Sequence, residues 1–248
     1  MKSILTLLCA FFLLFPNLTG CDRAGSEAPP ADSSTTAAQT GNPTSSELTS
    51  LDTRPVIVAF GDSLTAGYGV DSDESYPADL QRALDARGYH YRVVNEGVSG
   101  NTSKDGVLRI PEILKFHPSI VIVAFGGNDG LRGIPIRDTE MNLQTIISNL
   151  QDAHAKVILG GITLPPNYGS QYIAQFNAIY RKEAVTFHIP LLPFMLKGVY
   201  GVPGSMQGDG IHPTAKGCRQ VAKNFLPLLL PLLHKPPKPR TLAEDHPS

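Results

Sequence analysis

The sequence has almost no net charge. Its 248 residues include 21 Lys and Arg against 22 Asp and Glu, which leaves a formal charge of -1. Proteins that bind polynucleotides usually carry a basic field, because the phosphates attract cations. The lack of such a field makes a nucleic-acid partner unexpected. With 42% hydrophobic residues, the composition is instead that of a globular protein.

Cysteine is scarce as well. Cys9, Cys21 and Cys218 stand far apart, and no two of them have C-x-x-C spacing. Zinc sites usually take their thiolate ligands from such closely spaced pairs. The sequence therefore predicts no zinc site, and nothing in it calls for another metal or a cofactor.

No apolar run is long enough to cross a bilayer, which takes about 20 residues. Residues 3–15 are almost wholly apolar and end at Pro16, a length typical of a signal peptide. The following LTGC at 18–21 resembles the bacterial lipobox, whose cysteine is lipidated. The alternative is an ordinary cleavage site with a chance cysteine. We predict a lipoprotein signal peptide over 1–20 and a lipid anchor on Cys21.

We therefore predict that the protein is exported and held at a membrane, where it faces the periplasm or the cell exterior. Asp22, directly after the cysteine, is associated in enteric lipoproteins with the inner membrane. Residues 22–54 contain only two large apolar side chains, Leu48 and Leu51, so 21–54 is predicted to be a disordered tether. A coil of that length reaches about 30 Å. With Cys9 removed and Cys21 lipidated, no intrachain disulfide is possible.

One folded domain is expected over residues 55–234, as a monomer, followed by a flexible, Pro-rich tail at 235–248. Apolar runs without alternation at 56–60, 91–94, 120–125 and 157–159, with a weaker one at 190–193, predict strands buried on both faces. Helical candidates lie at 78–87, 104–116, 138–153, 170–187 and 215–233. Pro111 is predicted to interrupt the second, and Pro227 and Pro231 to kink or shorten the last. This alternation predicts an α/β fold with a parallel sheet of about five strands between helices.

Polar, Gly-rich clusters follow the predicted strands, at the edge where such sheets bind ligands. Ser63 lies two residues past the first strand, where a nucleophile belongs. His212 lies three residues after Asp209, so the carboxylate can accept from the imidazole while its other nitrogen takes the serine proton. Taken singly, a helix-capping serine or a surface turn explains these residues as well. The other six histidines have no such partner in a strand-end loop.

Acyl transfer also needs hydrogen-bond donors for the oxyanion. Gly100 can bring a backbone N–H close, and Asn128 can offer its side-chain amide from the neighbouring strand end. Each is more often a turn residue when it occurs alone. All four residue types in this order, each at a strand end or in a loop, favour a serine hydrolase.

Four blocks of the sequence resemble those of the GDSL, or SGNH, hydrolases: GDSLTAGYG at 61–69, NEGVSGNTS at 95–103, GGNDGLRG at 126–133 and DGIHP at 209–213. LPPNYG at 164–169 and PLLPF at 190–194 resemble the bacterial secreted thioesterase, lysophospholipase and arylesterase subgroup. The resemblance covers almost all of residues 55–232. It implies a three-layer, flavodoxin-like SGNH hydrolase fold.

The same resemblance implies the role of each site residue. Ser63 is the nucleophile and lends its backbone N–H to the oxyanion hole, with Gly100 and Asn128 as the other donors. His212 is the general base and then the acid, and Asp209 orients it. Asn101 stands where close relatives often carry Asp, and we expect no effect of this on the chemistry.

The implied activity is the hydrolysis of small carboxylic esters, thioesters or lysophospholipids through an acyl-enzyme. Segments 130–135 and 197–206 are predicted to shape the acyl pocket. The main alternative substrate class is acetylated envelope glycans, cleaved by a carbohydrate O-acetyl esterase.

Other classes fit less well. The G-x-S-x-G motif of ordinary α/β-hydrolases is absent from the chain. A two-metal phosphoesterase could use Asp62, Asn128, Asp129, Asp209 and His212, but such sites usually cluster several histidines. A catalytically inactive, tethered binding lipoprotein is the non-enzymatic alternative, and the presence of all four catalytic residue types argues against it.

Overall fold

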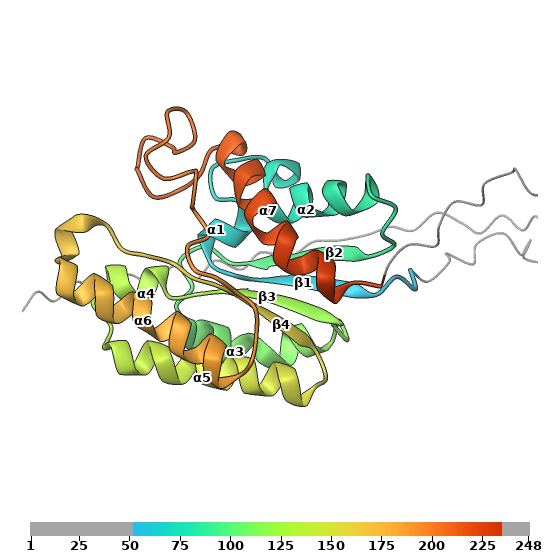
Figure 1. Cartoon of the computed structure of the whole chain (residues 1–248), viewed down its shortest axis with the longest axis horizontal. Coiled ribbons are helices and arrows are strands. Elements are labelled where there is room, and N and C mark those ends of the chain that lie inside the picture. The colour runs from blue at the N-terminus through green and yellow to red at the C-terminus, as the bar shows by residue number, and fades with distance from the viewer. Residues whose placement is uncertain (1–51, 235–248) are drawn as a thin grey trace, which may run out of the picture. The chain divides into compact units, whose positions relative to one another are not determined.

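The computed structural model describes residues 52–234, drawn in colour in Figure 1. The predicted signal peptide, the lipidation site at Cys21, most of the predicted tether and the tail at 235–248 lie outside the described residues. Within them, no helix is both long and apolar enough to cross a membrane.

A parallel sheet of five strands forms the centre of the fold, in the order β2-β1-β3-β4-β5. The strands are β1 (Val56–Gly61), β2 (Arg92–Gly97), β3 (Ile120–Ala124), β4 (Lys156–Gly160) and β5 (Leu191–Leu192). All five overlap predicted apolar runs, although β2 continues to Gly97, three residues past the predicted end, and the order is that of flavodoxin-like sheets. The predicted fold class is confirmed.

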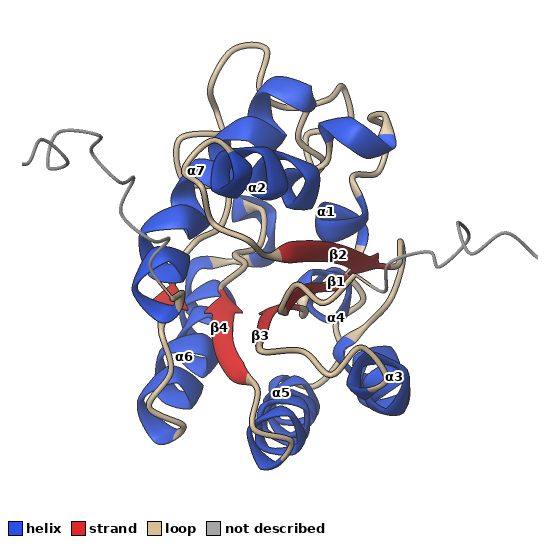
Figure 2. Cartoon of the chain, turned by 90° about the vertical axis from the view of Figure 1, so that its right-hand side faces the viewer, coloured by secondary structure: helices blue, strands red, loops and turns tan. Residues whose placement is uncertain are grey.

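Helices cover both faces of the sheet and make three layers (Figure 1, Figure 2). The helices are α1 (Ser63–Ala66), α2 (Tyr76–Asp85), α3 (Ser103–Leu114), α4 (Gly127–Leu131), α5 (Ile136–Asp152), α6 (Ser170–Thr186) and α7 (Ala215–Leu229), with 3-10 turns at Ser72–Glu74, Pro166–Tyr168 and Leu230–Leu232. α2 and α7 pack on one face, and α3, α5 and α6 on the other.

Burial differs between the strands more than the apolar runs predict. Every residue of β1 and β3 is buried, as expected for central strands. β2 is an edge strand, and its residues are only partly buried or exposed. The prediction that this run is buried on both faces is wrong, because only β1 flanks it. The charged and polar residues Arg92, Asn95 and Glu96 fit that edge position.

Pro111 does not interrupt α3. The helix runs from Ser103 to Leu114, and a capping box fixes its start: the Thr102 and Asp105 side chains each bond the other's backbone N–H. Pro111 lies on the exposed side, while Ile110 and Ile113 are buried in the core. Burial of these neighbours outweighs the loss of one backbone hydrogen bond. α7 likewise passes Pro227, and it ends at Leu229, four residues before the predicted end.

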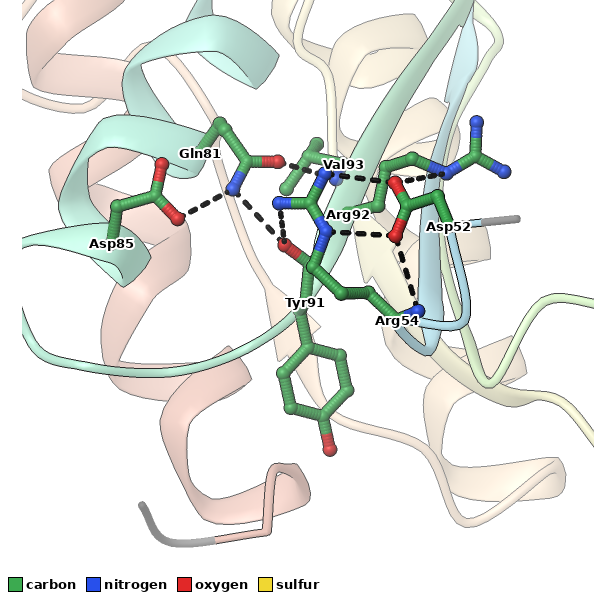
Figure 3. A network of polar contacts seen from close by, with 7 residues as sticks. All are labelled: Asp52, Arg54, Gln81, Asp85, Tyr91, Arg92 and Val93. Atoms are coloured by element: carbon green, nitrogen blue, oxygen red, sulfur yellow. Dashed lines mark hydrogen bonds and ion pairs between the residues drawn. The ribbon is translucent and has the colours of Figure 1, made fainter. Parts of the chain in front are cut away.

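The first described residues already belong to the fold (Figure 3). The Arg54 guanidinium pairs with Asp52 at 2.8 Å and donates to the Tyr91 carbonyl at 3.4 Å. Gln81 of α2 donates to the same carbonyl at 3.0 Å and accepts the Val93 N–H at 2.7 Å. Residues 52–54, predicted as the end of the tether, are therefore attached to the entrance of β2.

Candidate active site

The loops that follow the strands meet at the carboxyl edge of the sheet. The chain passes from β1 to β2 on one side and then to β3 on the other, which creates a topological switch point where ligands bind. Ser63 follows β1, Gly100 follows β2 and Asn128 follows β3. All three line one cavity together with His212.

Gly61 and Asp62 hold Ser63 in its turn. A Cβ at Gly61 would lie 2.6 Å from the Ala124 carbonyl oxygen, so only glycine lets the end of β1 pass this close to β3. The Asp62 side chain caps α1 by accepting the Leu64 N–H at 3.0 Å. Ser63 is consequently the first residue of α1.

Asp62 is also an unusual acid. It is 2% exposed, and this burial raises the pKa of its carboxyl to about 7; the Leu64 N–H opposes the rise and the Asp129 carboxylate adds to it. The folded protein therefore holds the Asp62 proton more tightly than the unfolded chain does. Stability contributed by this group is lost as the pH rises from the ordinary value of 3.8 to about 7.

We expect Asp62→Asn to remove that loss. The amide still accepts from Leu64 but does not ionise, so the variant gains stability relative to wild type between about pH 5 and pH 8, by up to roughly 4 kcal/mol for a shift of about three pKa units. Thermal midpoints of both proteins across this range measure the effect. Parallel pH profiles would contradict a raised pKa at Asp62.

Ser63, His212 and Asp209 form a continuous chain of hydrogen bonds. The His212 Nε2 lies 2.8 Å from the Ser63 Oγ, and the His212 Nδ1 lies 2.6 Å from the Asp209 Oδ2. The Asp209 Oδ1 accepts the backbone N–H groups of Ile211 and His212 at 2.9 and 3.0 Å. These bonds orient the carboxylate and the imidazole before a substrate binds.

Asp209 is ionised at neutral pH. Partial burial pushes its pKa upward, but the hydrogen bonds from the His212 ring and from the two backbone N–H groups outweigh it and lower the pKa to about 2. Asp209 is therefore an acceptor for the Nδ1–H, which leaves the Nε2 lone pair facing the serine hydroxyl. The arrangement can take the Ser63 proton and stabilise the resulting imidazolium.

Gly100 and Asn128, the predicted oxyanion donors, line the same cavity as Ser63. Gly100 has a φ of +83°, a backbone conformation that favours glycine. The Asn128 Nδ2 donates to the Asn101 carbonyl at 2.8 Å, which fixes the amide and leaves its second N–H for another acceptor. The Arg132 guanidinium holds the Gly100 carbonyl at 2.9 Å. The predicted roles of Gly100 and Asn128 are compatible with these positions.

Gln207 connects the two distant segments that carry the triad. Its Nε2 donates to the Tyr68 carbonyl at 2.7 Å and to the Pro213 carbonyl at 2.8 Å, and its backbone N–H donates to the His212 carbonyl at 2.8 Å. Tyr68 follows α1, which starts at Ser63. Gln207 thereby fixes the distance between the serine turn and the histidine loop, a role that the sequence did not indicate.

We expect Gln207→Glu to lower kcat by about tenfold to a hundredfold with little change in KM, because small displacements of reacting groups are costly. A carboxylate oxygen replaces the donor and faces two carbonyl oxygens. Gln175→Glu makes the same chemical change on the exposed side of α6 and is the control. A variant with a lower thermal midpoint but an unchanged kcat would make Gln207 merely structural.

An apolar cavity of about 860 Å³ opens beside Ser63. Most of its wall is hydrophobic: Leu131, Ile162, Leu164, Ile173, Phe194 and Leu196. The predicted pocket segments 130–135 and 197–206 contribute only Leu131 and Tyr200. Each predicted segment thus borders the cavity, but most of the wall comes from the loop after β4, the start of α6 and the segment after β5. A cavity of this kind fits the apolar part of a substrate.

The family follows from the match of residues 59–220 to the model of the GDSL-like Lipase/Acylhydrolase family. The chain belongs to this family. This GDSL hydrolase is 42% identical over 187 residues to the Esterase TesA of Pseudomonas aeruginosa. The aligned region covers 75% of this chain and 93% of TesA. The chain is 41% identical over 179 residues to the Thioesterase 1/protease 1/lysophospholipase L1 of Escherichia coli (strain K12), covering 72% and 85%.

A solved structure supports the same assignment. The crystal structure of TesA matches with a TM-score of 0.70 and 42% identity, over 72% of this chain and 99% of that one. As a GDSL hydrolase with esterase and thioesterase relatives, the protein is a serine hydrolase of ester bonds.

The rival phosphoesterase site does not assemble in the GDSL hydrolase. The Asp129 carboxylate is fully buried and accepts the Ser103 N–H and hydroxyl at 2.8 and 2.5 Å and the Thr139 hydroxyl at 3.3 Å. Within residues 52–234, no three His, Cys, Asp or Glu side chains are grouped to hold a metal ion. Cys218 is a buried free thiol, and burial raises its pKa to about 11.

Proposed function

We propose that this GDSL hydrolase cleaves acyl esters and thioesters whose acyl chain lies in the apolar cavity, with Ser63 as the nucleophile. The observation that carries the proposal is the hydrogen-bonded chain from Ser63 through His212 to Asp209 at the mouth of that cavity. The esterase and thioesterase names of the relatives support the same substrate class.

In the first half of the reaction, the His212 Nε2 takes the Ser63 proton as the Ser63 Oγ attacks the carbonyl carbon. The carbonyl oxygen becomes an oxyanion, held by the Ser63 and Gly100 backbone N–H groups and the Asn128 amide. The intermediate collapses, the bond to the leaving alcohol or thiol breaks, and His212 returns the proton to the leaving group. Asp209 stabilises the imidazolium while it lasts.

In the second half, water takes the place of the alcohol. His212 removes its proton, the hydroxide oxygen attacks the acyl-enzyme carbonyl, and the Ser63–acyl bond breaks with return of the proton to the Ser63 Oγ. The free acid is the product. The proton transfers of both halves run along the hydrogen-bonded chain of Ser63, His212 and Asp209.

A substrate panel tests this proposal. Aryl esters, acyl thioesters, lysophospholipids and acetylated sugars are assayed on one enzyme preparation, with and without EDTA. We expect turnover of the first three classes that rises with acyl length until the cavity is filled, and no effect of EDTA. Turnover of acetylated sugars alone would favour the O-acetyl esterase, EDTA-sensitive phosphoesterase activity would favour the metal enzyme, and no turnover would favour a binding lipoprotein.

We further propose that the domain is held at a membrane by lipid on Cys21. The short apolar run at 3–15 and the LTGC sequence at 18–21 support this location, and Asp22 favours the inner membrane. Two or more buried acyl chains suffice for stable anchoring. All proposed catalytic residues lie between Ser63 and His212, so the anchor is separate from the chemistry.

Cys21→Ala is therefore expected to abolish lipid labelling and to release the exported protein from the membrane fraction. Its kcat on a small soluble aryl ester should equal that of wild type, because no catalytic group is near the substitution in the sequence. Metabolic labelling with a fatty-acid analogue, fractionation and the ester assay give the three measurements. Continued membrane retention without lipid would contradict the assigned anchor.

A further inference from the structure

Exposed hydrophobic side chains are concentrated around the mouth of the cavity. Eight large hydrophobic residues in the described part of the chain are 37 to 75% exposed. Three are on separate helices away from the site: Leu108 on α3, Met141 on α5 and Val185 on α6. The other five are in loops at the carboxyl edge of the sheet, and we call them the rim: Tyr68, Val98, Tyr200, Val202 and Ile211.

The rim adjoins the cavity. Tyr68, Tyr200 and Ile211 line it, and the Tyr68 ring lies 4.6 Å from the His212 ring. Val98 directly precedes the lining residues Ser99 and Gly100. Val202 is 37% exposed and donates its backbone N–H to the Val199 carbonyl, in the same loop as Tyr200. Exposed apolar side chains are therefore present both on the cavity wall and on the loops that supply it.

A single bound acyl chain does not cover this surface. Such a chain fills the cavity, but Val98 and Val202 are outside the lining and stay in water. Exposed apolar area costs about 25 cal/mol per Å², and a patch beside a binding groove is typical of an interaction site. We propose that the rim rests on a lipid surface, so that an acyl chain passes from the lipid into the cavity without crossing water.

The choice of lipid rests on the proposed function, since acyl chains surround such a substrate in a membrane. The place where the described chain begins also allows the rim to contact a membrane. Asp52 precedes β1, at the edge opposite the rim, and 51 residues come before it. β1 has six residues and is about 20 Å long, whereas the tether predicted from the sequence would reach about 30 Å. A membrane attachment near Cys21 is thus compatible with the rim facing the same membrane.

Charges around the rim are mixed. Arg132 and Lys197 are exposed cations near it, and Asp71 and Asp209 are exposed acids. Attraction to anionic headgroups is therefore not expected to dominate. The contact should form on zwitterionic phosphatidylcholine and depend little on salt.

The sequence contains no tryptophan, so one introduced tryptophan is a unique reporter. Val202→Trp places it on the rim, and Val185→Trp places it on the exposed side of α6 as the matched control. Both full-length proteins are mixed with phosphatidylcholine vesicles, with and without brominated acyl chains. We expect a shift of the Val202→Trp emission to shorter wavelength and quenching by bromine, with neither change in Val185→Trp. Equal behaviour of the two variants would overturn the proposal.

A kinetic comparison tests the consequence for catalysis. Val98→Ser with Val202→Ser should lower kcat/KM on a long-chain ester embedded in vesicles by about tenfold, because apolar contact with the lipid is lost. Leu108→Ser with Val185→Ser is the control and should have no effect. Turnover of a short soluble ester should be unchanged in both, which separates this proposal from the proposed function itself.

Two outcomes would reject lipid contact while leaving the esterase intact. One is an unchanged rate on the vesicle substrate in the rim variant. The other is a blue shift of the Val202→Trp emission that grows with protein concentration in the absence of vesicles, since that would mean that a second copy of the chain covers the rim.

Discussion

Replacement of Ser63 by alanine is expected to lower kcat on every accepted ester by about 10⁴ to 10⁶, the usual loss when a triad serine is removed. The Ser63 Oγ is the atom that would form the acyl-enzyme, and it lies 2.8 Å from the base that would activate it. A fluorophosphonate should label wild-type protein at Ser63 alone. Kinetics and peptide mapping of the labelled protein measure the two effects.

Ser170→Ala is a suitable control, because Ser170 lines the same cavity but has no histidine partner among the described residues. This variant should keep its activity and its labelling. Normal turnover without Ser63, or label on a different serine, would reject Ser63 as the nucleophile. Loss of folding is checked by the thermal midpoint, which a hydroxyl deletion at the cavity surface should change little.

Asn128→Ala is expected to lower kcat by about 10² to 10³ with a small change in KM, because an oxyanion donor acts mainly in the transition state. The substitution also removes the bond from Asn128 to the Asn101 carbonyl. Asn128→Asp keeps the size of the side chain and removes the donor, so it should show a similar loss. Affinity for a phosphonate transition-state analogue should fall in parallel with kcat.

A large rise in KM with unchanged kcat would contradict this role and make Asn128 a residue that binds the substrate in its ground state. A loss in Asn128→Ala that Asn128→Asp does not share would assign the effect to packing rather than to the missing N–H. The two variants together therefore separate the donor from the space it fills.

Local signals in the sequence were sufficient for the sheet and for the positions of three of the proposed catalytic residues. The buried strands are short β-branched runs, and the loops after them carry Gly, Asn and Asp, which turns need. Because the carboxyl ends of parallel strands share one edge, the positions of Ser63, Gly100 and Asn128 followed from strand order alone. Edge and centre could not be separated in this way, and β2 was consequently predicted to be too buried.

The features that the sequence did not reveal depend on contacts between distant segments. The cavity walls combine the loop after β4 with the start of α6 and the residues after β5, and no local pattern encodes that contact. Gln207 reads as an ordinary polar loop residue, although its amide joins Tyr68 to Pro213. The pKa of Asp62 depends on how completely the fold buries its carboxyl. The GDSL motif alone does not predict that burial.

Tyr91 fastens both ends of the described chain. Arg54 donates to its carbonyl at 3.4 Å, and the His234 N–H donates to its hydroxyl at 3.1 Å. The two ends of the domain therefore lie close together, and a short linker from His234 to Arg54 would join them into a circular chain. The chain can then be reopened at a surface loop, since circular permutation is tolerated where the backbone is exposed and weakly bonded. The order in which the segments are joined is separable from the sheet that they build.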